Sequence, residues 1–175
     1  MSEGQLYKVL GEGRGSFHGG TWNRWTPGVW REVEGPLEPC KNGIHMLRRQ
    51  DVVAWLGPQL WLAEHEGELV EAGDKVVVRR ARITEQTAWN ERTARVFAAD
   101  CAEHVLHLFE AAYPGDDRPR KAVEAARAYA RGEIGARELS YAAAAYAAAA
   151  RYAAAARYTS ERAWQTERLW GVVGG

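Results

Sequence analysis

The stretch DCAEHVLHLFEAAYPGDDRPRKAVEAARAYARGEI, residues 100–134, decides the fold class of the second half of the chain. Apolar residues recur three and four positions apart on both sides of the Pro-Gly pair at 114–115, which is the spacing of amphipathic helices. The two aspartates at 116–117 can cap a helix, and Pro119 suits its first turn. The stretch therefore predicts two helices joined by a tight turn, the second of which ends at Gly132.

The first of these helices begins upstream of the quoted stretch. Its expected apolar face consists of Trp89, Val96, Phe97, Cys101, Val105, Leu108, Phe109 and Ala112. The second helix has a shorter apolar face, made of Ala122, Val123, Ala126, Tyr129 and Ala130. Because apolar faces of this kind are buried against other elements, they predict a helical bundle.

An alanine-rich segment follows the two helices. Residues 141–158 read YAAAAYAAAARYAAAARY, in which 12 of the 18 residues are alanine. Alanine has the highest intrinsic helix propensity, so we expect one long helix from about Arg137 to Leu169. The pattern leaves open whether this helix bends, breaks or projects. Its small side chains would let another helix approach closely, which makes a homo-oligomer formed through it a further expectation.

Residues 1–83 differ in composition, because short apolar runs alternate there with glycine and proline. Such runs predict β-strands at Leu6–Leu10, Gly28–Val33, Gly43–Leu47, Leu60–Glu64 and Lys75–Ile83. One further run, Arg49–Leu56, predicts a short helix that ends at the following Gly-Pro pair. We therefore expect an α+β protein with two domains: a small β-rich domain at 1–83 and a helical domain with the alanine-rich helix at 84–175.

Charge and cysteine content exclude several classes of protein. Lys and Arg together number 23, as do Asp and Glu, so no net charge would attract nucleic acid or an anionic membrane. The two cysteines, Cys40 and Cys101, form no CxxC motif of the kind that zinc ribbons use. The N-terminus lacks the basic end and apolar run of a signal peptide, so we expect a cytoplasmic protein.

Three motifs carry chemistry-bearing residues but fall short of a site. GEGRGSF, at 11–17, is followed by neither a helix nor GK[ST], which favours a surface loop over a phosphate loop. Cys40 and His45 supply only two of the four ligands that a structural zinc takes. The acidic and histidine residues at 100–110 lack matching ligands from a facing helix. We therefore expect no metal, no cofactor and no complete catalytic constellation.

Trp22, Trp25 and Trp30 lie within nine residues, which is an unusual density of aromatic side chains. Large side chains help a small domain to bury enough area, but aromatic anchors also form binding surfaces. Core packing and a ligand platform therefore both stay open. The candidate ligand pocket consists of Trp22, Trp25 and His45.

The helical half resembles the immunity-protein helical domain found with bacterial polymorphic toxins and in phage and mobile-element genes. The resemblance covers residues 99–134 and the alanine-rich run, and is carried by the helix at 101–110, Asp117-Arg118-Pro119-Arg120, Ala122, Ala125–Arg127 and Arg131-Gly132-Glu133. It implies a non-enzymatic protein that binds and neutralises a protein target. Arginine and tyrosine side chains combine apolar area with directional donors, so the candidate partner-binding residues are Asp117, Arg118, Arg120, Tyr141 and Tyr152.

The N-terminal half resembles a small uncharacterised domain of phage and bacterial proteins through YKVL, CKNGIH and GDKVVVRRARI. More remotely, it is similar to ADP-ribosyltransferase folds, in which His45 would take the place of an aromatic residue of the nicotinamide pocket. This likeness implies an alternative function, that of a nucleotide-binding protein or enzyme. None of the nearby acidic residues Glu64, Glu66 and Glu68 matches the catalytic glutamate of those folds, and likeness of fold alone does not confer activity. A structural protein that oligomerises through the alanine-rich helix is a third possibility.

Overall fold

The structure is a computed structural model, and it describes residues 4–18, 20, 22, 24–139 and 158–174. The chain separates into two compact units, Met1–Asn90 and Glu91–Gly175. Strands make up the first unit and helices the second, so the predicted α+β class is confirmed. The division between domains that the sequence places at residues 83 and 84 stays a proposal.

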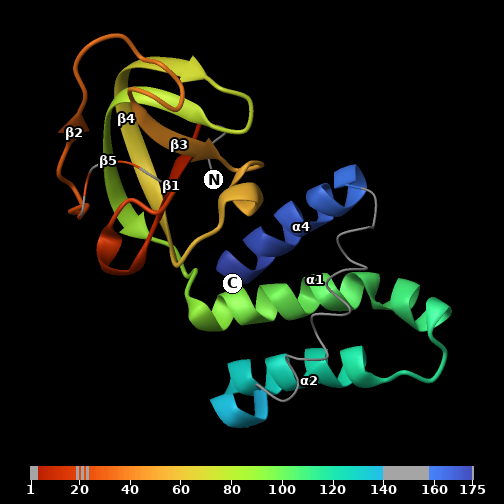
Figure 1. The fold of residues 1–175 in the computed structure, drawn as a ribbon. Helices are drawn as coiled ribbons and strands as arrows, with labels where there is room; N and C mark the ends of the chain where they lie inside the picture. The colour runs from red at the N-terminus through yellow and green to blue at the C-terminus, as the bar shows by residue number, and fades with distance from the viewer. Residues whose placement is uncertain (1–3, 19, 21, 23, 140–157, 175) are drawn as a thin grey trace. The chain divides into compact units, whose positions relative to one another are not determined.

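Five antiparallel strands form the sheet of the first unit. They are β1 (Leu6–Leu10), β2 (Arg31–Glu32), β3 (Ile44–Arg48), β4 (Gln59–Glu71) and β5 (Val76–Gln86). The order across the sheet is β2-β5-β3-β1-β4, and β4 also pairs with β5. This second pairing closes the sheet into a small barrel, which Figure 1 shows from one side.

The core of the barrel follows from the alternation of side chains along each strand. Leu6 and Leu10 of β1 point to the same side, because residues an even number of positions apart along a strand do so. They belong to one buried cluster with Trp25, Ile44, Met46, Trp61, Ala63, Val76, Val78, Ala81 and Ile83. Trp25, Leu10 and Val76 are completely buried, so residues from the loop and from two strands fill the barrel interior.

β4 is longer than the sequence predicts, because it continues past Glu64 to Glu71. The run EHEGELVE has too many charges to be predicted as a strand. In the structure these charges are paired across to β5: Glu64 with Arg82, Glu66 with Arg80 and Glu68 with Arg79. Cross-strand pairs of opposite charge stabilise a sheet, and they explain the extension.

Two other predictions for this unit need correction. The expected strand Gly28–Val33 is reduced to the two residues of β2, which pair with Arg80 and Ala81 of β5. The expected helix Arg49–Leu56 is only a 3-10 turn, Val52–Trp55, and the side chain of Asp51 does not cap it. A second 3-10 turn, Glu12–Arg14, lies in the loop after β1.

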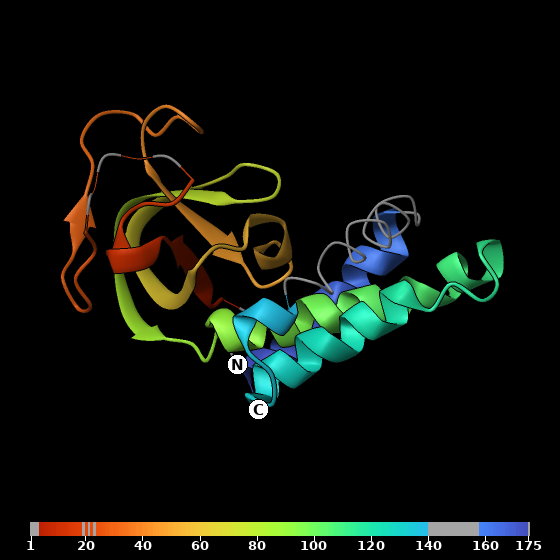
Figure 2. The same cartoon turned by 60° about the horizontal axis from the view of Figure 1, so that its bottom comes forward.

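Three helices are described in the second unit: α1 (Glu91–Ala112), α2 (Arg118–Arg131) and α4 (Tyr158–Val173). α1 packs against both α2 and α4, and Figures 1 and 2 both show α2 running beside α1. Ala99 and Ala102 of α1 meet Val123 and Ala126 of α2, so small side chains form this contact. None of the helices described here is long and apolar enough to cross a membrane.

The ends of α2 agree with the sequence in part. Gly132 adopts φ +77° and its amide donates to the carbonyl of Tyr129, which ends the helix as predicted. At the start, the carboxylate of Asp116 accepts the amide of Arg118 at 3.2 Å. The side chain of Asp117 makes no such bond, so Asp116 is the aspartate that caps.

The buried face of α1 also differs from the expected one. Leu108 is 41% exposed, whereas the neighbouring Leu106 is 4% exposed. Because α1 packs against both α2 and α4, its buried surface differs from the predicted apolar face and includes Leu106. The alanine-rich residues 140–157 lie outside the described residues, so the long helix and the oligomer that it would form stay predictions.

Candidate functional site

The turn between α1 and α2 carries three of the predicted partner-binding residues. Arg118 donates two hydrogen bonds to the carboxylate of Asp116, from Nε at 2.8 Å and from Nη2 at 2.5 Å. This guanidinium holds the pKa of Asp116 at about 2. The side chain of Arg118 is nevertheless 73% exposed. The pair therefore stays charged at all physiological pH values and is open to solvent.

Arg120 and Asp117 are held in a similar way. Arg120 donates to Glu110 of α1 from Nε at 2.9 Å and from Nη2 at 2.6 Å, which ties the start of α2 to the end of α1. Asp117 pairs with Lys121 at 2.7 Å, one helical turn away. Each predicted residue thus lies on the surface with its charge oriented by a neighbour, which lowers the entropy lost when a partner binds.

Two exposed apolar side chains near the C-terminal end of α1, one inside the helix and one directly after it, were missed by the sequence analysis. Leu108 is 41% exposed and Tyr113, which contacts Phe109, is 48% exposed. Leu108 was assigned to the core. Tyr113 comes directly before Pro114 and Gly115, past the apolar face of the helix. This position in the sequence could have indicated that its side chain is exposed. We call Leu108, Tyr113, Arg118 and Arg120 the turn surface.

A buried carboxylate joins the three helices. Asp100 of α1, 8% exposed, accepts from Arg127 of α2 at 2.6 Å and from Arg168 of α4 at 2.7 Å. Arg127 also donates to Glu103 through two bonds. These charges pair with one another, so the cluster holds α2 and α4 to α1.

The neighbouring groups extend the contact between α1 and α4. The ring of His104 stacks on that of Trp164, with centroids 3.8 Å apart, and lies 3.4 Å from a carboxylate oxygen of Glu161. Burial and nearby carboxylates raise the pKa of Cys101 to about 12, which makes this thiol a poor nucleophile. Within the described ranges, no group of three or more His, Cys, Asp or Glu side chains could hold a metal.

The structure brings the predicted ligand-pocket residues together only in part. Trp22 and Trp25 meet edge to face with centroids 5.3 Å apart, and Trp25 is completely buried in the barrel. His45 lies on β3, where its Nε2 accepts the amide of Cys40 at 3.0 Å, and burial lowers its pKa. Lys8 lies between the two groups: its Nζ donates to the carbonyl of His45 and stands 5.4 Å from the Trp25 ring centroid.

Of the other aromatic residues that the sequence analysis names, one lies on the surface of the barrel and two lie outside the described residues. Trp30 packs against the guanidinium groups of Arg80 and Arg82, at 4.7 and 4.6 Å. This arrangement covers an ion-paired face of the barrel. Tyr141 and Tyr152 fall in the range 140–157, which the structure does not describe.

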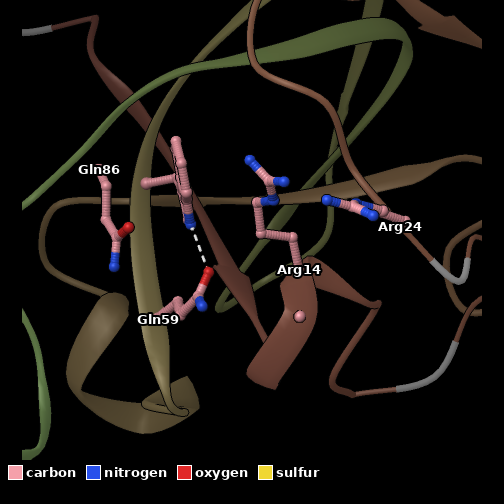
Figure 3. Close-up of a pocket in the computed structure, with 6 residues that line it drawn as sticks. Arg14, Arg24, Gln59 and Gln86 are labelled. Atoms are coloured by element: carbon pink, nitrogen blue, oxygen red, sulfur yellow. Dashed lines mark hydrogen bonds between the residues drawn. The ribbon is translucent and has the colours of Figure 1, made fainter.

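A pocket of about 370 Å³ opens in the first unit, and none of the residues that line it belongs to the predicted ligand pocket. Its lining consists of Gly13, Arg14, Arg24, Gln59, Trp61 and Gln86, and Figure 3 shows the four polar side chains gathered around it. The indole Nε1 of Trp61 donates to Oε1 of Gln59 at 3.0 Å. Neither arginine was singled out in the sequence, because Arg14 lies in the glycine-rich loop and Arg24 between tryptophans.

Comparison with known proteins finds one similarity, which lies in the C-terminal part of the chain. Residues 85–157 match the model of the family described as Imm-5 like putative immunity protein. The matched range contains α1 and α2 and ends before α4. No curated protein and no solved structure matches the chain. The resemblance of the helical half is therefore confirmed at the level of the family, whereas that of the N-terminal half stays a prediction.

Proposed function

We propose that this protein is an immunity-type protein that binds a protein target through its helical unit and neutralises it. The observation that supports the proposal is the family match over residues 85–157. That range includes α1, α2 and the turn between them, where the predicted partner-binding residues lie. The chemistry of this region is that of a binding surface, since its charged groups are paired and exposed.

The turn surface supplies the two kinds of contact that protein interfaces use most. Tyr113 and Leu108 offer exposed apolar area, and Arg118 and Arg120 offer forked donors. A carboxylate of the target can share either guanidinium with its present partner, because each side chain is half or more exposed. The target surface that fits therefore offers both carboxylates and apolar side chains.

The local ion pairs also determine how binding should respond to salt. Exposed charges that steer association are screened within about 10 Å at 0.1 M salt. The rate at which the target associates with the turn surface should therefore fall as the salt concentration rises, while the apolar contacts with Leu108 and Tyr113 persist. A target captured at moderate salt should accordingly remain partly bound at high salt.

The test starts from the full chain carrying an affinity tag in its native host. Proteins captured at moderate and high salt are identified by mass spectrometry, and each candidate is then expressed alone and together with the chain. The expected result is one stoichiometric partner that stops growth when expressed alone and permits growth when the chain is present. A partner without toxicity, or the absence of any stoichiometric partner, would overturn the proposal.

A further inference from the structure

The pocket in the barrel unit is built by strand ends and by described residues of the loop after β1. β4 and β5 are paired where they contribute Trp61 and Gln86, which are register partners. The amide of Trp25 donates to the carbonyl of Arg14 at 2.8 Å, which brings the Arg24 segment beside the 3-10 turn. Arg14 adopts φ +67°, a conformation that few residues other than glycine take up. The two arginines are thus placed by backbone structure.

The electrostatics of the two pocket arginines differ from those of most arginines in this unit. Four others pair with glutamates of the sheet: Arg48 with Glu71, Arg79 with Glu68, Arg80 with Glu66 and Arg82 with Glu64. In the described part of the chain, no carboxylate lies within ion-pair distance of Arg14 or Arg24. Figure 3 shows the guanidinium of Arg24 pointing toward that of Arg14. Two like charges facing one another favour an anion between them.

The amide groups of the lining add further donors. Because Oε1 of Gln59 accepts from Trp61, the amide nitrogen of Gln59 is the atom left to donate into the pocket. The lining residues include two cations and no acid. Gln86 stands on the same side as Gln59 in Figure 3, opposite the arginines. The pocket therefore presents hydrogen-bond donors from two sides to whatever occupies it.

We propose that this pocket binds the phosphate group of a small phosphate monoester. A phosphate monoester is close to a dianion at neutral pH, so one group can neutralise both guanidiniums, whereas a single carboxylate can neutralise only one. The volume of about 370 Å³ exceeds the needs of a phosphate group and falls in the range of small-molecule sites. The remainder of the ligand would lie against Trp61 and Gln86. The proposal is independent of the target binding assigned to the helical unit.

Isothermal titration calorimetry of the full chain tests the ligand class. Inorganic phosphate, glycerol phosphate and malonate are titrated separately, so that the phosphate group, its ester and a dicarboxylate of similar charge are compared. Saturable binding of both phosphates, with the ester binding more tightly and malonate more weakly, is the expected result. Equal or tighter binding of malonate overturns the assignment to phosphate, as does the absence of saturable heat with either phosphate at millimolar concentration.

Variants locate the binding in the pocket. Arg24→Gln removes an exposed charge, and Gln59→Glu keeps the acceptor for Trp61 while replacing the amide donor with a carboxylate. The loss of one charged hydrogen bond corresponds to about a tenfold or greater weakening, and both variants should show it. Arg48→Gln, which removes an arginine of the same unit outside the pocket, is the matched control. Unchanged affinity in both pocket variants, or equal weakening in the control, would show that phosphate binds elsewhere.

Discussion

At the level of single residues, the two cysteines differ in their surroundings. Cys40 is exposed, whereas Cys101 is partly buried and its pKa is raised to about 12. The thiolate is the reactive form, so at pH 8 its fraction at Cys101 falls more than about a thousandfold below that of an ordinary thiol. Iodoacetamide should therefore alkylate Cys40 long before Cys101, as followed by peptide mass spectrometry. In urea both should react alike, and equal rates in the native protein would contradict the prediction.

The burial of Lys8 should change how the free energy of unfolding depends on pH. Burial lowers its pKa from 10.5 to about 8, so between these values the unfolded chain binds more protons than the folded one. The contribution of Lys8 to the free energy of unfolding therefore rises as the pH rises between these two values. Cys101 acts in the opposite direction, because its folded pKa is raised. The difference between the wild type and Lys8→Met isolates the lysine.

We expect the free energy of unfolding of the wild type to rise relative to that of Lys8→Met as the pH rises from 8 to 10.5. Urea unfolding at a series of pH values measures it. The substitution also removes the bond from Nζ to the carbonyl of His45, which shifts the variant by an amount that does not depend on pH. Parallel stability curves for the two proteins would show that the amine titrates as it does in water.

Among the elements, the helices of the second unit depend on one carboxylate. Asp100→Asn keeps the shape of the side chain but leaves the guanidiniums of Arg127 and Arg168 without their common counter-charge. Because both arginines are partly exposed, the expected loss in unfolding free energy is about 2–3 kcal/mol, below the range for a fully buried pair. Chemical unfolding measures it, and Glu133→Gln, which breaks an exposed pair on α2, should change little. Similar losses in both variants would refute a joining role for Asp100.

The elements also show what could be read from the sequence. β1 and the turn between α1 and α2 follow from local patterns, because alternation, proline and capping residues lie within a few positions of one another. The far end of β4 depends on arginines of β5, and the Asp100 cluster joins residues 68 positions apart. The pocket arginines likewise meet through loop hydrogen bonds. Such pairings arise from the tertiary fold, so no local pattern in the sequence predicts them.

On the scale of the whole molecule, the two units carry different kinds of site. The family match covers residues 85–157, which contain α1 and α2 and also the last residues of the first unit, so it bears mainly on the helical unit. The barrel has a donor-lined pocket, and the helical unit has an exposed, ion-paired turn. We therefore expect that the proposed target binding and the proposed phosphate binding can be disrupted separately, each by variants in one unit.

The final prediction separates binding from stability at the turn surface. Replacing Arg118 and Arg120 together by alanine should weaken capture of the protein target by about tenfold or more, because arginine anchors are frequent hot spots. The melting temperature should stay nearly unchanged, since both side chains are exposed and such ion pairs contribute little to stability. Arg131→Ala is the matched control, because Arg131 holds an equally exposed pair with Glu133 at the other end of α2. A large fall in melting temperature would assign the two arginines to the fold, and equal weakening by Arg131→Ala would place the target elsewhere.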